Sequence, residues 1–155
     1  MARHLQLLKV EELEVNHRVG AWLLAVLGVL TLGTGIYFMA VRPPLLPEDL
    51  RFTAVNPALL PPQFGAWLQI VFRTWGGFVT GFAIVLLGIA MQLLTGRNVW
   101  LRCGVALGLF VAFGRFLASN ILLRSEYLWF IGLLFVLAAA TAVLLLWPPR
   151  VAGPR

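Results

Sequence analysis

Four long segments with no charge, or with a single charge, decide what this chain can fold into. Three of them are runs of 23 uncharged residues, 19–41, 74–96 and 127–149, and the fourth, 103–123, holds one arginine in 21 residues. A helix rises about 1.5 Å per residue, so each segment can cross the roughly 30 Å hydrocarbon core of a bilayer. The composition agrees, because 61% of the residues are hydrophobic and only 12% are charged. The sequence therefore predicts an integral membrane protein.

The predicted fold class is all-α: a bundle of four transmembrane helices in a single membrane domain. The 22 residues from Arg42 to Gln63 hold six prolines, which disfavour a regular helix and favour extended or turn conformations. We expect a stiff, ordered outer loop there. The expected order is an inner tail (1–18), helix (19–41), outer loop (42–63), helix (64–95), inner loop (96–102), helix (103–123), outer turn (124–126), helix (127–147) and inner tail (148–155).

The distribution of lysine and arginine predicts that both termini are cytoplasmic, because short positively charged loops are retained on that side of the membrane. Four arginines fall on the outer side, Arg42, Arg51, Arg73 and Arg124. Seven basic residues fall on the inner side: Arg3, Lys9, Arg18, Arg97, Arg102, Arg150 and Arg155. Residues 1–17 contain three glutamates and no apolar core, so they do not read as a secretory signal peptide. They predict a cytoplasmic tail, with an interfacial amphipathic helix as the alternative.

Several kinds of chemistry lack the residues they need. His4 and His17 both lie outside the apolar segments, and Cys103 is the one cysteine, so the pattern predicts no metal or cofactor site and no intrachain disulfide. No nucleophile has an evident base beside it, so no catalytic residue is predicted. The net charge of +6 is spread along the chain instead of forming the basic patch that nucleic-acid binding requires.

Arg115 is the residue that needs an explanation, because an isolated cation inside a membrane helix is costly. One interpretation is that its side chain reaches along Ser119 and Asn120 to the outer headgroups. The other is that it faces the bundle and is paired. No Asp or Glu lies inside the four segments, so we expect the outer loop to bring Glu48 or Asp49 towards Arg115, or towards the second candidate, Arg73.

Arg73 and Arg115 support a second hypothesis as well. Arginine side chains suit phosphate and carboxylate groups, so the two could line an outer-leaflet site for a lipid or another anionic small molecule. The candidate polar cluster that covers both hypotheses consists of Arg73, Arg115, Asn120, Glu48, Asp49 and Arg51.

Small residues spaced along two segments predict close helix contacts. In a membrane the hydrophobic effect does not drive helices together, and small side chains let two helix backbones approach closely enough to gain packing contacts. The contact would be made with another helix of this chain or with a partner subunit. The residues are Gly77, Gly81 and Gly88 in the second segment, and Gly104, Gly108 and Ala112 in the third.

The run VRPPLLPEDLRF, residues 41–52, resembles an outer-loop signature of small, functionally uncharacterised bacterial membrane proteins, and that resemblance implies no activity. The four-segment layout is also similar to the small membrane enzymes that bind glutathione, but FRTWGGF, residues 72–78, does not match their pattern. We therefore expect a multi-pass protein of the bacterial cytoplasmic membrane, non-enzymatic, that serves as an accessory subunit among other membrane subunits and lipids. The alternative is a protein that binds or transports a lipid or an anionic small molecule through Arg73 and Arg115, and an intramembrane enzyme is third.

Overall fold

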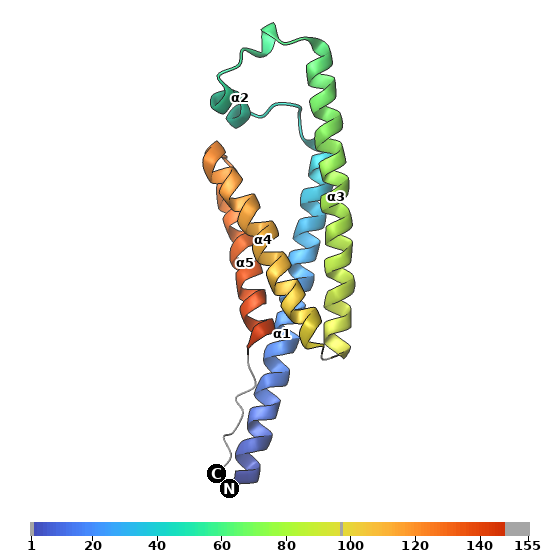
Figure 1. The fold of residues 1–155 in the computed structure, drawn as a ribbon, viewed down its shortest axis with the longest axis vertical. Coiled ribbons are helices and arrows are strands. Elements are labelled where there is room, and N and C mark those ends of the chain that lie inside the picture. The colour runs from blue at the N-terminus through green and yellow to red at the C-terminus, as the bar shows by residue number, and fades with distance from the viewer. Residues whose placement is uncertain (1, 97, 148–155) are drawn as a thin grey trace.

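A computed structural model describes residues 2–96 and 98–147, with side chains from Val15 onward. Within those ranges the chain is helical, as predicted, and four helices are long and apolar enough to span a membrane. Figure 1 shows the order of the elements. They are α1 (Ala2–Ile36), which runs into the π-helical turn η1 (Tyr37–Val41), α2 (Pro47–Thr53), the 3-10 turn η2 (Pro57–Leu59), α3 (Pro62–Thr95), α4 (Val99–Leu123) and α5 (Leu128–Leu146).

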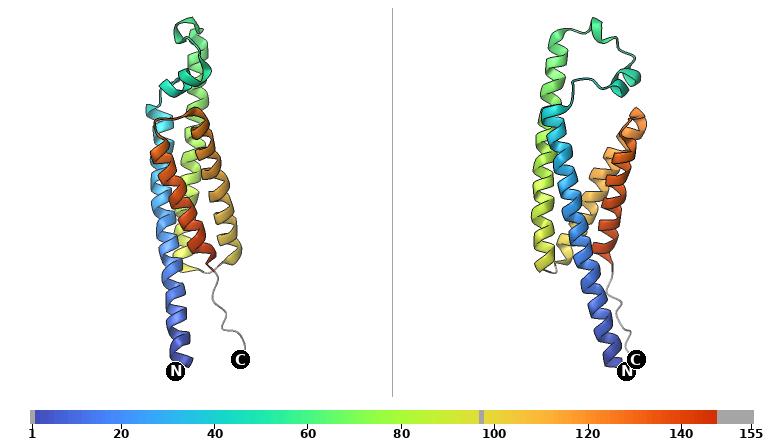
Figure 2. Two further views of the ribbon diagram at one scale, coloured as in Figure 1. Left: turned by 90° about the vertical axis from the view of Figure 1, so that its left-hand side faces the viewer. Right: turned by 180° about the vertical axis from the view of Figure 1, so that it is seen from behind.

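The four long helices alternate in direction, and they form two antiparallel hairpins. Helix α1 packs against α3 and α5, and α4 packs against α5. The two hairpins diverge towards the end that carries α2, which lies above the end of α4 (Figures 1 and 2). Because the number of spans is even, the start of the first span at Val15 and the end of α5 at Leu146 lie at the same end of the bundle. The assignment of that end to the cytoplasm stays a prediction.

Three helix starts differ from those expected. Helix α1 begins at Ala2, so residues 2–18 of the predicted tail continue the first span as helix; they are rich in Leu and Glu, which favour helix. Helix α4 begins at Val99 instead of residue 103, because the Asn98 side chain accepts a hydrogen bond from the Leu101 N–H at 3.1 Å and caps the helix. Helix α3 begins at Pro62, where the missing N–H of proline costs nothing.

The outer loop also contains more helix than its prolines indicate. Pro47 occupies the first turn of α2, and Pro57 opens the turn η2. Proline disfavours helix interiors but is well suited to a helix start, where its fixed φ is already helical. The loop is therefore ordered, as expected, but through short helical turns instead of extended chain.

The contact between α1 and α3 is built on small residues that recur every seven positions, a spacing that keeps them on one face of each helix. An added Cβ at Gly35 would meet the backbone oxygen of Gly76 at 3.0 Å, and one at Gly28 would meet the Leu87 side chain at 2.9 Å. The two backbones can approach this closely only because these side chains are absent or short. The buried small residues are Ala21, Gly28 and Gly35 in α1, and Gly76, Ala83 and Ala90 in α3.

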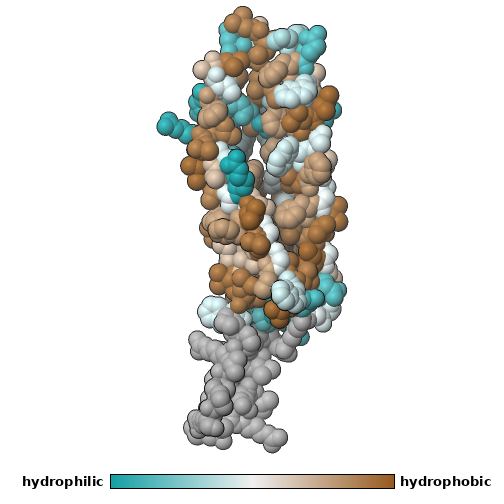
Figure 3. Space-filling model, viewed as in Figure 1, coloured by the Kyte–Doolittle hydropathy of each residue, from teal (hydrophilic) through white to brown (hydrophobic). Residues whose placement is uncertain are grey.

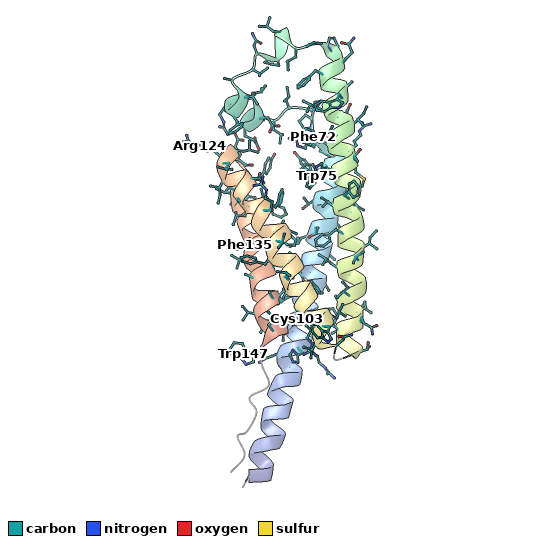
Figure 4. All side chains as sticks on the ribbon, viewed as in Figure 1. Phe72, Trp75, Cys103, Arg124, Phe135 and Trp147 are labelled. Atoms are coloured by element: carbon teal, nitrogen blue, oxygen red, sulfur yellow. The ribbon has the colours of Figure 1, made fainter. Side chains whose placement is uncertain are left out.

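Leucine side chains from all four long helices fill the centre of the bundle. Leu24, Leu27, Leu109 and Leu134 are each at most 1% exposed, and Leu86 of α3 joins them at 3%. The outer surface of the spans is apolar, and the hydrophilic colour gathers mainly towards the two ends of the spans (Figure 3). Aromatic side chains mark both ends: Trp75 lies towards the α2 end and Trp147 at the opposite end (Figure 4). That distribution is typical of a membrane-spanning bundle.

Candidate functional site: a polar cap at the outer end

The polar cap is the cluster formed by the loop between α1 and α3 where it meets the end of the bundle opposite Val15, which we call the outer end after its predicted orientation. Its centre is Arg42, whose side chain is only 5% exposed. The π-helical turn places this residue, because the Arg42 N–H donates to the Tyr37 carbonyl oxygen at 2.9 Å, five residues back. Single π-helical turns are found frequently at functional sites. Here the turn directs Arg42 under the loop that follows it.

A short ion pair holds Arg42 within the cap. Its Nη2 lies 2.7 Å from Oδ2 of Asp49, and the same oxygen accepts a hydrogen bond from the Leu46 N–H at 2.9 Å. The other terminal nitrogen, Nη1, donates to the carbonyl oxygen of Pro43 at 3.0 Å and lies 3.4 Å from that of Pro44. Asp49 therefore has two tasks: it caps the start of α2 and balances the arginine.

Two phenylalanine rings complete the surroundings of this arginine. The guanidinium carbon of Arg42 lies 3.4 Å from the ring centroid of Phe72 in α3 and 5.6 Å from that of Phe38. Both distances fall within cation–π range, and such contacts gain strength where water is excluded. Arg42 thus connects three pieces of chain: the end of α1, the start of α2 and the outer part of α3. Figure 4 labels Phe72 on α3.

A second contact ties the cap to the other hairpin. The Ser125 hydroxyl donates to Oε1 of Glu48 at 2.9 Å, and the Ser125 oxygen accepts from the Tyr127 N–H at 3.2 Å. Glu48 is 3% exposed and Ser125 7%, so this bond is shielded from solvent. In the part of the chain that the structure describes, the second carboxylate oxygen of Glu48 has no hydrogen-bond partner. Glu48 consequently joins α2 to the turn between α4 and α5.

The rim of the cap is open to solvent. Arg51 donates to the carbonyl oxygen of Arg124 at 3.3 Å and lies 3.5 Å from a carboxylate oxygen of Glu126. The side chains of Arg51 and Glu126 are 57% and 59% exposed, so water screens this pair. Arg124 lies at the outer end of α4 beneath α2 (Figure 4).

The expected pairing of the loop with Arg73 or Arg115 does not form. The loop does lie over the outer end, but Asp49 pairs with Arg42, and Glu48 bonds to Ser125. Over residues 15–96 and 98–147, neither Arg73 nor Arg115 has a carboxylate within 4 Å, and both are exposed. The physical reason is sequence distance: Arg42 is seven residues from Asp49 and already shares its loop.

The remaining polar candidate, Asn120, is bound within its own helix. Its side-chain amide donates to the Phe116 carbonyl oxygen at 2.9 Å, and the Ser119 hydroxyl donates to the Arg115 carbonyl oxygen at 3.0 Å. These bonds satisfy the polar groups locally. The structure therefore does not bring Asn120, Arg73 and Arg115 into one pocket with the cap.

The small-residue faces predicted for helix contacts point away from the bundle. An added Cβ at Gly77, Gly81, Gly88, Gly104 or Gly108 would meet no heavy atom within 4 Å. Ala112 is also exposed. On α3 the missing side chains leave an open notch of about 400 Å³, lined by Thr74, Gly77, Phe78, Gly81 and Phe82. Of the two contacts that the sequence left open, the one within the chain is therefore excluded for these faces.

The sequence pattern marks Arg42 only as an outer charge and does not single out Phe72 or Ser125. One signal was available, because Phe38 precedes Arg42 by one helical turn and Asp49 follows within the same short loop. No sequence pattern links Ser125 to a loop 77 residues away. At the inner end, Nη1 of Arg102 lies 3.0 Å from Nε2 of His17, a contact that sequence analysis also missed.

Comparison with known proteins gives no relative. No protein-family model matches the chain, and no curated protein or solved structure matches it either.

Proposed function

We propose that this protein is an accessory subunit that associates laterally with other proteins in the membrane, and that it works without catalysis in the bacterial cytoplasmic membrane. The observation that supports this most strongly is the notch at Gly77 and Gly81. These glycines lie four residues apart on an apolar helix and are exposed, and no described residue has a heavy atom within 4 Å of a Cβ added at either of them. This spacing is typical of faces at which membrane helices associate.

The contrast within α3 strengthens the proposal. Its inward face already uses Gly76 and Ala83 for the close contact with α1, so the fold does not need the outward glycines for its own packing. Glycine at positions 77 and 81 is less favourable for the helix than alanine, by up to about 1 kcal/mol per residue in a soluble helix. A partner helix seated in the notch supplies a reason for that cost.

The polar cap fits the same role. It joins the two hairpins at the outer end through Arg42 and Glu48, and this keeps the outward faces of α3 and α4 in a fixed relation. Phe52 and Leu59 on the loop are 64% and 81% exposed. Exposed apolar side chains on an ordered loop are suited to contact with a partner beyond the membrane surface.

A second candidate function is the binding of an anionic lipid or small molecule. It is favoured by the exposed guanidinium groups of Arg73 and Arg115, since arginine binds phosphate and carboxylate well. The two functions predict different states of the purified protein: a complex with fixed stoichiometry for the first, and a single chain with bound lipid for the second.

The test is the mass of the particle that a mild detergent extracts from the protein's own membrane. We expect the wild-type chain to elute in a heteromeric particle with a partner in fixed ratio. The double variant Gly77→Leu/Gly81→Leu fills the notch and should release a single chain. Gly33→Leu is the matched control, because Gly33 is an exposed glycine of α1 with nothing within 4 Å, and it should leave the particle intact. A wild-type protein that elutes as a lone chain with bound lipid would overturn the proposal in favour of the second candidate.

A further inference from the structure

We infer that the outward face of α4 binds a transmembrane helix that carries an aspartate or glutamate, and that this carboxylate pairs with Arg115. The inference rests on the proposed function and adds the chemistry of the partner. The starting observation is the positive charge of Arg115. This residue lies on α4, whereas the notch described above lies on α3.

Arg115 lies within the membrane span of α4, which runs from Val99 to Leu123. It is eight residues from the outer end of that helix, a rise of about 12 Å. Its side chain is exposed on the outside of the bundle, and across the described residues its guanidinium group makes no ion pair. A cation at this depth is costly unless it meets a counter-charge or water.

The carboxylates of the outer loop and of the turn after α4 are engaged elsewhere. Asp49 is held by Arg42, and Glu48 is buried against Ser125. Glu126, the carboxylate nearest to Arg115 in sequence, lies outside the span and pairs with Arg51 at 3.5 Å. A second copy of this chain cannot supply the charge within the membrane either, because none of the four spans contains Asp or Glu. The complementary charge must come from another molecule.

The surroundings of Arg115 favour a helix as that molecule. Gly108 lies two helical turns below Arg115 and Ala112 one turn below it, and both are exposed, so a partner backbone can approach closely. Val111 and Leu122 on the same side are 60% and 67% exposed and provide apolar contact around the charge. A lipid phosphate would compensate the arginine but would not need the small residues below it.

The experiment places a diazirine amino acid at Val111 of the full-length chain and irradiates the protein's own membranes. We expect an adduct whose cross-linked segment is a transmembrane helix of another protein, with an Asp or Glu within about two helical turns of the linked residue. Arg115→Leu should reduce the adduct at least tenfold. Arg73→Leu, which removes another exposed arginine without an ion pair, should leave the yield unchanged.

Three outcomes would overturn the inference: adducts only with lipid or with a second copy, a partner helix without a carboxylate, or an unchanged yield in Arg115→Leu. A diazirine at Ile84, on the outward face of α3, separates this failure from that of the proposed function. If Ile84 captures a partner helix and Val111 does not, only the inference fails. If neither position captures protein, the proposed function fails as well.

Discussion

Arg42 and Arg115 have the same side chain but opposite surroundings. Arg42 ends the first apolar helix, is 5% exposed, and has an aspartate at 2.7 Å and a phenylalanine ring at 3.4 Å. Arg115 interrupts an apolar helix, is exposed, and has no counter-charge among the residues described. The fold compensates the arginine at the membrane surface and leaves the one within the membrane uncompensated. We infer from this difference that Arg42 stabilises the fold of this chain, whereas Arg115 is compensated by another molecule.

The largest expected effect comes from Arg42→Gln. The change leaves Asp49 without its counter-charge in a site that is mostly shielded from solvent, and breaking one side of such a pair typically costs about 3 kcal/mol or more. We expect the free energy of unfolding in detergent micelles, followed by circular dichroism, to fall by about that amount. Arg73→Gln is the control, with an expected change within about 0.5 kcal/mol. Equal losses in both variants would remove the distinction between a structural and an external arginine.

Gly76→Ala should have the next largest effect. It tests the contrast between the face of α3 that packs against α1 and the face that points away from the bundle. The added Cβ would lie 2.8 Å from the Gly35 carbonyl oxygen and 2.8 Å from the Met39 nitrogen. Neither backbone atom can move freely, so we expect a loss of about 1–3 kcal/mol in the same unfolding measurement. Gly77→Ala meets no atom within 4 Å and should leave the stability equal or slightly higher. A loss in Gly77→Ala as large as that in Gly76→Ala would mean that the outward face is packed.

Ser125→Ala tests the bond between the cap and the second hairpin. It removes the hydroxyl that donates to the buried Glu48 carboxylate, and an unsatisfied buried group costs about 1–3 kcal/mol. We expect a loss near the lower limit, together with faster hydrogen exchange in α2. Ser119→Ala removes a hydroxyl that bonds only to its own helix and should change neither quantity. Unchanged exchange in α2 after Ser125→Ala would show that Glu48 does not hold the cap.

The smallest effect is expected from Arg51→Ala at the rim. Its pair with Glu126 spans 3.5 Å between side chains that are more than half exposed, and such pairs contribute less than about 1 kcal/mol. We expect a change within about 0.5 kcal/mol that disappears at high salt. A loss comparable to that of Arg42→Gln would place the main electrostatic contact of the cap at its rim.

The sequence predicted the fold class because hydropathy and helix length decide which segments can cross a bilayer. Each of the four predicted spans lies within or close to an observed helix, and the deviations at Ala2, Pro62 and Val99 arise from local helix propensity and capping. The ordered outer loop was also predicted, although its helical turns were not. These features depend on neighbouring residues, which a sequence displays directly.

The candidate site was predicted only in part, because it depends on contacts between distant residues. Glu48 and Asp49 were identified as the carboxylates that matter, but the sequence could not rank Arg42 above Arg115 as the partner of Asp49, or indicate that Glu48 bonds to Ser125. The same limit applied to the glycines, since Gly76 and Gly77 are adjacent in sequence and differ only in the direction they face. That direction follows from the seven-residue repeat shared by α1 and α3, which becomes visible only when the two helices are aligned.

The most direct test of the central claim, that the counter-charge of Arg115 lies outside this chain, is the free energy of unfolding of isolated Arg115→Leu relative to the isolated wild type. The variant removes a charge that has no partner in the described chain, so its stability should equal or exceed that of the wild type. A loss of about 2 kcal/mol or more, approaching that expected for Arg42→Gln, would show that the chain compensates Arg115 itself and would contradict the account.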